Sequence, residues 1–223
     1  METAIQSTAM METALRSVSA KEAINRSESV VDAAQRLIRR TGIQKTTVSD
    51  IARELQMSSA NIYRFFASRS EINVAVCRRI FDEIERIVEE EIAESPGPAS
   101  ATLREIILAI DRLNTLRFTA DRKLHELFEV AHNENWSILR EHCRRLDELC
   151  EQIIKEGMMA GEFRAGDARL ASILFRSICL KFCNPRLTAE EPQPTIEQVV
   201  DFCLAALAGQ EAAEADRQVL ITA

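Results

Sequence analysis

Apolar residues recur every three to four positions along most of the chain, and short polar or proline-containing segments interrupt them. This period matches the α-helix, whereas the alternating runs typical of half-buried strands are few. The pattern predicts nine helices, at about residues 27–41, 47–55, 58–66, 68–94, 99–119, 121–131, 134–158, 167–182 and 195–208. We therefore expect an all-α protein.

The segment TVSDIARELQMSSANIYRFFASRSEI, residues 47–72, contains two short amphipathic helices joined by a tight turn. Thr47 can cap the first helix, with Asp50 as an acidic partner in its first turn. Ser58 or Ser59 can cap the second helix, in which Ile62 points inward. This arrangement is typical of a helix-turn-helix, whose second helix lies in the DNA major groove.

Residues 26–72 resemble the DNA-binding domain of the tetracycline-repressor (TetR) family of bacterial regulators. The matching residues are Ala33, Ala34, Gly42, Thr46, Thr47, Ile51, Ala52, Ser58, Ile62, Tyr63, Phe66 and Arg69. Gln56 stands where the family usually has the turn glycine, Phe65 where a histidine is common, and Arg69 where a lysine is usual. Since a residue other than glycine tolerates a positive φ poorly, Gln56 suggests a slightly different turn.

Candidate DNA contacts follow from the place of each side chain in this motif. An asparagine such as Asn61, near the start of the second helix, can pair with adenine, and the Tyr63 hydroxyl can reach a phosphate while its ring packs. Arg64 and Arg69 are interpreted mainly as phosphate contacts, and Thr47 as a phosphate contact through its hydroxyl and backbone N–H. The full predicted set is Thr47, Ser58, Ser59, Asn61, Tyr63, Arg64 and Arg69. The structural alternatives are a surface asparagine, a core tyrosine, solvated arginines and a simple cap.

Charge is distributed unevenly along the chain. The net charge is −7, yet residues 26–80 hold 10 Lys and Arg against 5 Asp and Glu. A basic segment on an acidic body can contact phosphate while the body is held away from the duplex. The uneven charge therefore favours DNA binding by this segment.

The resemblance implies nine helices in two domains. Three form a small N-terminal domain, and six form a larger C-terminal domain that dimerises and holds a small-molecule pocket. Six residues are predicted to line an apolar effector pocket, although each could equally be core: Phe118, Phe128, Trp136, Met158, Phe175 and Cys179. Six residues on the last two helices are predicted to form a twofold four-helix interface with a second copy: Leu170, Leu174, Ile178, Val199, Val200 and Leu207. We expect a homodimeric repressor that a small apolar effector releases from a pseudo-palindromic operator.

Other functions have less support in the sequence. Cys179 and Cys183 could report redox state, and His125, Glu129 and His132 share a helical face, but buried thiols and a polar helix face explain both patterns. A thiol- or metal-responsive regulator and a helical interaction module without DNA function remain the alternatives. No glycine-rich phosphate loop, GxSxG or HExxH motif occurs in the sequence, so we predict no enzyme activity, cofactor or metal.

The limits of the two folded domains follow from the resemblance, and those of the arm and the tail from the sequence itself. Residues 1–25 are polar and are expected to form a flexible arm, residues 26–72 the DNA-binding domain, residues 73–209 the effector and dimerisation domain, and residues 210–223 a loose tail. No apolar run reaches the roughly 20 residues of a membrane span, and no signal-peptide core is present, so a cytoplasmic protein is expected.

Overall fold

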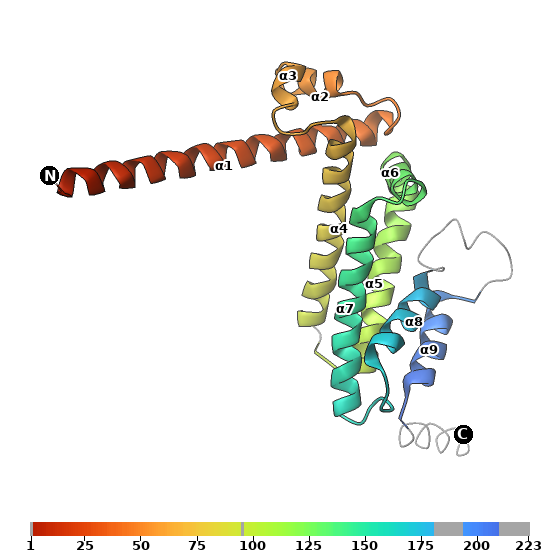
Figure 1. Cartoon of the computed structure of the whole chain (residues 1–223). Helices are drawn as coiled ribbons and strands as arrows, with labels where there is room; N and C mark the ends of the chain where they lie inside the picture. The colour runs from red at the N-terminus through yellow and green to blue at the C-terminus, as the bar shows by residue number, and fades with distance from the viewer. Residues whose placement is uncertain (1, 95, 181–193, 210–223) are drawn as a thin grey trace, which may run out of the picture. The chain divides into compact units, whose positions relative to one another are not determined.

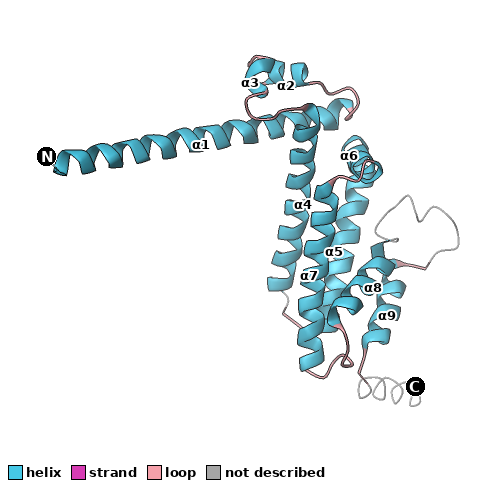
Figure 2. Ribbon diagram, viewed as in Figure 1, coloured by secondary structure: helices cyan, strands magenta, loops and turns pink. Residues whose placement is uncertain are grey.

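The computed structural model describes residues 2–94, 96–180 and 194–209. These residues form nine helices, and the part of the chain described contains no strand beyond one isolated bridge between Phe163 and Ala208 (Figures 1 and 2). The helices are α1 (Glu2–Thr41), α2 (Val48–Glu54), α3 (Ser59–Ile62), α4 (Arg69–Glu94), α5 (Ala99–Ala120), α6 (Arg122–Asn133), α7 (Ser137–Met159), α8 (Ala168–Leu180) and α9 (Ile196–Leu207). The all-α fold predicted from the apolar period is confirmed.

The chain divides into two compact units. The first comprises residues 1–78 together with 123–131, and the second comprises residues 79–122 and 132–223. The first unit thus includes most of α6, which the division at residue 72 did not anticipate. Helix α4 begins in the first unit and ends in the second.

In the first unit, α1 is much longer than predicted, because it begins at Glu2 and not at about Ser27. Its last turns supply the core of the unit through Val30, Ala34 and Ile38, all completely buried. Gly42 ends the helix with a φ of 88°, and its N–H donates to the Ile38 carbonyl at 2.8 Å. This left-handed position is the helix end expected for a glycine.

In the second unit, α5 and α7 pack along each other, α8 packs on α7, and α9 packs on both α5 and α8. Figure 1 shows α4, α5 and α7 running alongside one another. The packed faces bury large aliphatic side chains, including Leu103, Ile106, Ile107, Ile138 and Ile154. Removing these side chains from water is the main source of stability in this unit.

The turn between α7 and α8 ties three helices together. The Glu162 carboxylate accepts the N–H groups of Ala99 and Ser100 at 2.7 and 2.8 Å, which caps the start of α5. The backbone of the same turn bonds the end of α9, because the Arg164 N–H donates to the Leu207 carbonyl at 3.0 Å. The turn is therefore fixed from both sides.

Gly157 lies inside α7, two residues before its end. A Cβ atom at Gly157 would lie 2.4 Å from the Phe163 ring, so only glycine lets this aromatic side chain pack on the helix. Gly161, with a φ of 77°, follows the helix end.

Buried and half-buried polar groups join α4 to α7 and α7 to α8 within the second unit. His142 Nδ1 lies 2.5 Å from a Glu85 carboxylate oxygen, and its ring stacks on Phe81 with centroids 4.2 Å apart. Arg176 forms a two-point ion pair with Asp147. No helix in the described segments is long and apolar enough to cross a membrane.

Candidate nucleic-acid interface

Helix α2 begins with a reciprocal cap. The Asp50 N–H donates to the Thr47 hydroxyl at 3.1 Å, while the Thr47 N–H and hydroxyl donate to the Asp50 carboxylate at 3.1 and 2.6 Å. The predicted cap is therefore confirmed. The two Thr47 donors that we assigned to a phosphate are both engaged by Asp50, so a phosphate could use them only by displacing that carboxylate.

The turn between α2 and α3 keeps the geometry that glycine usually provides. Gln56 adopts a φ of 54°, and the Met57 N–H closes the helix end by donating to the Ala52 carbonyl at 2.8 Å. This bonding pattern is a Schellman motif with a left-handed residue after the C-cap. The expected change of turn at Gln56 is wrong: the residue accepts the strained conformation instead.

Helix α3 is capped by Ser58, whose hydroxyl accepts the Asn61 N–H at 3.2 Å. Ile62 is completely buried and fixes the helix on the core of the unit. Helical turns continue past the end of α3, because the Phe66 N–H donates to the Ile62 carbonyl at 3.2 Å. The residues predicted to read DNA therefore stand on a short helix with one buried anchor.

The side chains around this anchor differ in exposure. Tyr63 is 51% exposed, so the alternative of a core tyrosine is wrong. Ser58 and Arg64 are also exposed, while Ser59 and Asn61 are half-buried. Tyr63 and Arg64 thus have the free surface that contact with a duplex requires, and Asn61 retains part of its side chain at the surface.

Arg69, at the start of α4, has a structural partner that the sequence did not reveal. Its Nη2 donates to the Ile43 carbonyl at 2.5 Å, across 26 residues of sequence. A guanidinium carries five N–H donors, so this bond leaves others for a phosphate. Arg69 therefore holds the loop between α1 and α2 in addition to any contact with DNA.

Lys45 was not among the predicted contacts, but it is exposed in the loop that leads to the α2 cap. An exposed cation three residues before a helix start is well placed to approach a phosphate. Its position two residues before the cap Thr47 was the signal that could have identified it.

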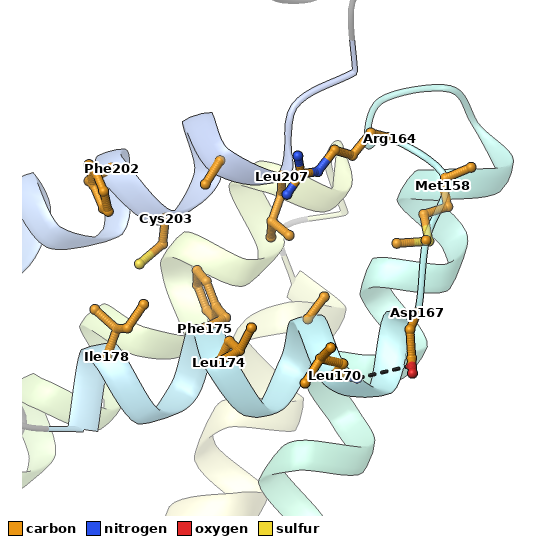
Figure 3. Close-up of a pocket in the computed structure, with 14 residues that line it drawn as sticks. Met158, Arg164, Asp167, Leu170, Leu174, Phe175, Ile178, Phe202, Cys203 and Leu207 are labelled. Carbon is orange, nitrogen blue, oxygen red and sulfur yellow. Dashed lines mark hydrogen bonds between the residues drawn. The ribbon is translucent and has the colours of Figure 1, made fainter.

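A separate apolar groove lies between α8 and α9, with a volume of about 280 Å³ (Figure 3). Met158, Arg164 and Asp167 lie at one end of it, and Ile178 and Phe202 lie toward the other. Of the six predicted pocket residues, Met158 and Phe175 line this groove. Cys179 is completely buried, and Phe118, Phe128 and Trp136 are half-buried outside the groove lining.

Helix α8 exposes large apolar side chains along one face. Leu170, Leu174 and Ile178 are 54%, 53% and 43% exposed, so this face leaves apolar area in contact with water. The predicted α9 half of that face is corrected by the structure, because Val199, Val200 and Leu207 are at most 9% exposed and pack inside the subunit. Phe202, which sequence reasoning missed, is 71% exposed on α9 instead.

Two family models match the chain. The one for bacterial regulatory proteins of the tetR family matches residues 30–76, which hold α2, α3 and the anchor Ile62. The one for the tetracyclin repressor-like C-terminal domain matches residues 99–202. The chain belongs to the TetR family. The resemblance inferred from residues 26–72 is therefore confirmed and extends to the C-terminal domain.

Solved structures share the fold of this TetR-family chain at low sequence identity. The fatty acid degradation regulator FadR from Bacillus halodurans is 18% identical, with a TM-score of 0.59 over 83% of this chain and 95% of that one. A TetR/AcrR regulator from Thermobifida fusca is 21% identical, with a TM-score of 0.55 over 81% and 95%. AibR, solved with isovaleryl coenzyme A and operator DNA, is 18% identical, with a TM-score of 0.51 over 82% and 98%. A search of curated proteins found no significant match.

The thiols of this TetR-family protein are mostly buried. Burial raises the pKa of Cys150 to about 12, and burial also raises the pKa of Cys203. A thiol held protonated in the core is a poor nucleophile toward oxidants. Cys183, the second residue of the pair that suggested a redox response, lies outside the described residues.

Within the described segments, no group of three or more His, Cys, Asp or Glu side chains is placed to hold a metal ion. His125 lies 3.8 Å from Glu129 on the same helix, and His132 is exposed. The pKa of His142 is lowered, chiefly by burial, against the opposing effect of the Glu85 carboxylate.

Proposed function

We propose that this TetR-family protein is a homodimeric, ligand-responsive transcriptional repressor. The observation that supports the proposal best is the capped helix α3, which anchors itself through buried Ile62 and leaves Tyr63 and Arg64 exposed. A helix held in this way can enter a major groove without losing its position on the protein.

Each contact has a distinct proposed role. Asn61 reads an adenine edge through its amide, since asparagine offers a donor and an acceptor in the required geometry. Tyr63 and Arg64 bind phosphate, together with Ser58, Ser59, Lys45 and the free donors of Arg69. Thr47 contributes a phosphate contact after its hydroxyl leaves Asp50.

The proposed dimer uses the exposed face of α8 and Phe202 of α9. Leu170, Leu174 and Ile178 leave apolar area in water that a second copy would cover by a twofold operation. The dimer would place two recognition helices in successive major grooves, about 34–36 Å apart. A pseudo-palindromic operator follows from this symmetry.

The proposed effector is a small apolar molecule. Effector binding would favour a spacing of the two DNA-binding domains that no longer fits the operator, and so release the repressor. Trp136 is the only tryptophan in the chain, so a fluorescence change on addition of a candidate effector would indicate binding that alters the surroundings of the start of α7.

Selection of bound fragments from genomic DNA, followed by salt-dependent affinity measurement on the recovered sequence, tests the proposal. We expect one inverted repeat to be enriched and the affinity to fall steeply with salt, because phosphate contacts release counterions. Binding without sequence preference, or no binding at low salt, would refute a role in transcriptional regulation.

A further inference from the structure

Most of helix α6 belongs to the first unit, which contains the helix-turn-helix, although α6 is far from the rest of that unit in sequence. Residues 123–131 cluster with residues 1–78 and not with the helices that flank them. The family model for the DNA-binding domain matches the chain only up to residue 76, and α6 falls within the match for the C-terminal domain. The apolar side of α6 is covered completely, since Leu124, Leu127 and Ala131 are at most 1% exposed.

Lys123 of α6 contacts the end of α1. Its Nζ donates a hydrogen bond to the Arg40 carbonyl, 83 residues away in sequence. Arg40 is the residue before the last one of α1, so its carbonyl is among the four that helix geometry leaves without a donor from the helix. An ammonium group at this position also opposes the negative end of the helix dipole.

Glu126, one turn further along α6, lies close to Gly42, which follows the end of α1. A Cβ atom at Gly42 would be 3.4 Å from a Glu126 carboxylate oxygen. Lys123 and Glu126 thus face the last turn of α1 and the left-handed glycine that follows it. The path that the chain takes out of α1 is set at these two positions.

The loop after Gly42 is held by further bonds that lead to the DNA-reading helices. The Gly42 carbonyl accepts the Thr46 N–H at 3.2 Å and the Thr46 hydroxyl at 2.9 Å. The Ile43 carbonyl accepts from Arg69, and Thr47 then caps α2. A displacement of the α1 end would therefore pass to α2 and α3 through a short loop that these bonds hold at Gly42, Ile43 and Thr46.

We propose that Lys123 is a positioning residue for DNA binding, which fixes the loop between α1 and α2 from outside the helix-turn-helix and touches no DNA itself. The inference rests on the proposed DNA-binding function only in its last step. Its first step, that Lys123 holds residues 42–47, concerns the free protein and can be measured separately.

Three variants of the full chain test the proposal. Lys123→Met keeps the aliphatic stem and removes the donor, whereas Lys123→Arg keeps both a donor and the charge. Arg122→Met removes the same charge from the adjacent exposed residue and serves as the control. Amide hydrogen exchange over residues 42–66, the unfolding midpoint, and affinity for the selected DNA at several salt concentrations are measured for each.

We expect Lys123→Met to exchange faster over residues 42–66 and to bind DNA about tenfold more weakly, with the salt slope of the wild type. Lys123→Arg should keep the exchange rates and the DNA affinity of the wild type, and Arg122→Met should change neither. A salt slope reduced by about one in Lys123→Met would instead make Lys123 a direct phosphate contact and overturn the proposal.

Three other outcomes are also decisive. Unchanged exchange in Lys123→Met would refute the positioning role whatever the DNA result. If the wild type selects no DNA, the proposed function fails and the DNA step of this inference fails with it, while exchange still decides whether Lys123 holds the loop. If Lys123→Met simply unfolds, Lys123→Arg decides: a folded Arg variant that exchanges faster would contradict the proposal.

Discussion

Thr47 and Asp50 hold each other through three hydrogen bonds, in which the Thr47 hydroxyl both donates and accepts. The pair starts α2 and also uses the donors nearest to the expected phosphate. The cap therefore links the stability of the helix-turn-helix to the way in which it meets DNA. A variant at either residue should affect both properties.

The first prediction concerns the pH dependence of this cap. Hydrogen bonds from Thr47 lower the pKa of Asp50 below its ordinary value of 3.8. A carboxyl group whose pKa is lower in the folded state stabilises the fold above its unfolded pKa, and this contribution is lost as the pH falls through the folded pKa. We expect Asp50→Asn to flatten the fall in stability below about pH 4, measured by urea unfolding. Thr47→Ala should do the same, and an unchanged profile in both variants would contradict the cap.

The second prediction concerns the strained turn. Gln56 has a φ of 54°, a conformation that is unfavourable by about 1 kcal/mol for a residue with a Cβ. We expect Gln56→Gly to stabilise the protein by about 0.5 kcal/mol, because the greater freedom of glycine in the unfolded chain offsets part of the gain. Gln56→Ala keeps the strain and is the matched control. Thermal unfolding of the three proteins measures the difference, and equal midpoints for Gly and Ala would show that no strain is released.

The third prediction concerns base recognition. Asn61→Ala should relax the preference at one operator position by about 1–3 kcal/mol, because the bidentate contact to adenine is lost. Binding to a panel of operators with single base changes measures this. Asn133→Ala, at an exposed asparagine at the end of α6, is the control and should bind like the wild type. If Asn61→Ala retains both affinity and preference, another residue reads the base.

The fourth prediction separates the dimer face from the subunit core. Leu174 is 53% exposed, whereas Val200 is completely buried. We expect Leu174→Glu to give a folded monomer that binds the operator weakly, since each subunit would place an unpaired carboxylate in the seam. Val200→Glu should unfold the subunit itself. Sedimentation and circular dichroism distinguish the two results, and a Leu174→Glu variant that remains dimeric would rule out this face.

The fifth prediction concerns His142. Burial lowers its pKa from the ordinary value of 6.5, with smaller effects from Arg145 and Arg176, while Glu85 opposes the shift. A histidine that stays neutral in the fold but takes up a proton when unfolded makes stability fall as the pH drops below 6.5. Urea unfolding at pH values above and below 6.5 should show this loss of stability in the wild type and a smaller loss in His142→Gln. The exposed His132→Gln is the control, and a wild type with equal stability throughout would refute the shift.

The fold could be predicted from the sequence because long apolar stripes at helical spacing specify both the elements and their buried faces. Thr47 adds a polar signal of the same kind, since the cap predicted at this residue marks the start of α2. The start of α1 could not be predicted in this way, because residues 2–25 show no such stripe. The local pattern was sufficient to predict a helix only where one side of that helix packs against the rest of the protein.

The site was predicted less completely, for reasons of tertiary structure. Helix α9 is apolar on several sides, so its sequence did not show that Val200 would pack inward and Phe202 outward. The bond from Arg69 to Ile43 and that from Lys123 to Arg40 join residues far apart in the chain. No local pattern marks such pairs, although they hold the loop that precedes the predicted DNA contacts.

The bridge between Phe163 and Ala208 has a consequence for how members of such a family can diverge. It joins the chain before α8 to the chain after α9, and the Gly209 N–H closes it on the Glu162 carbonyl at 3.0 Å. The segment that carries the exposed α8 face therefore enters and leaves the body at a single paired junction. Because α8 also packs on α7 and α9 on α5, an exchange of residues 163–208 between relatives would have to preserve both packed faces, while α2 and α3 lie outside the exchanged segment.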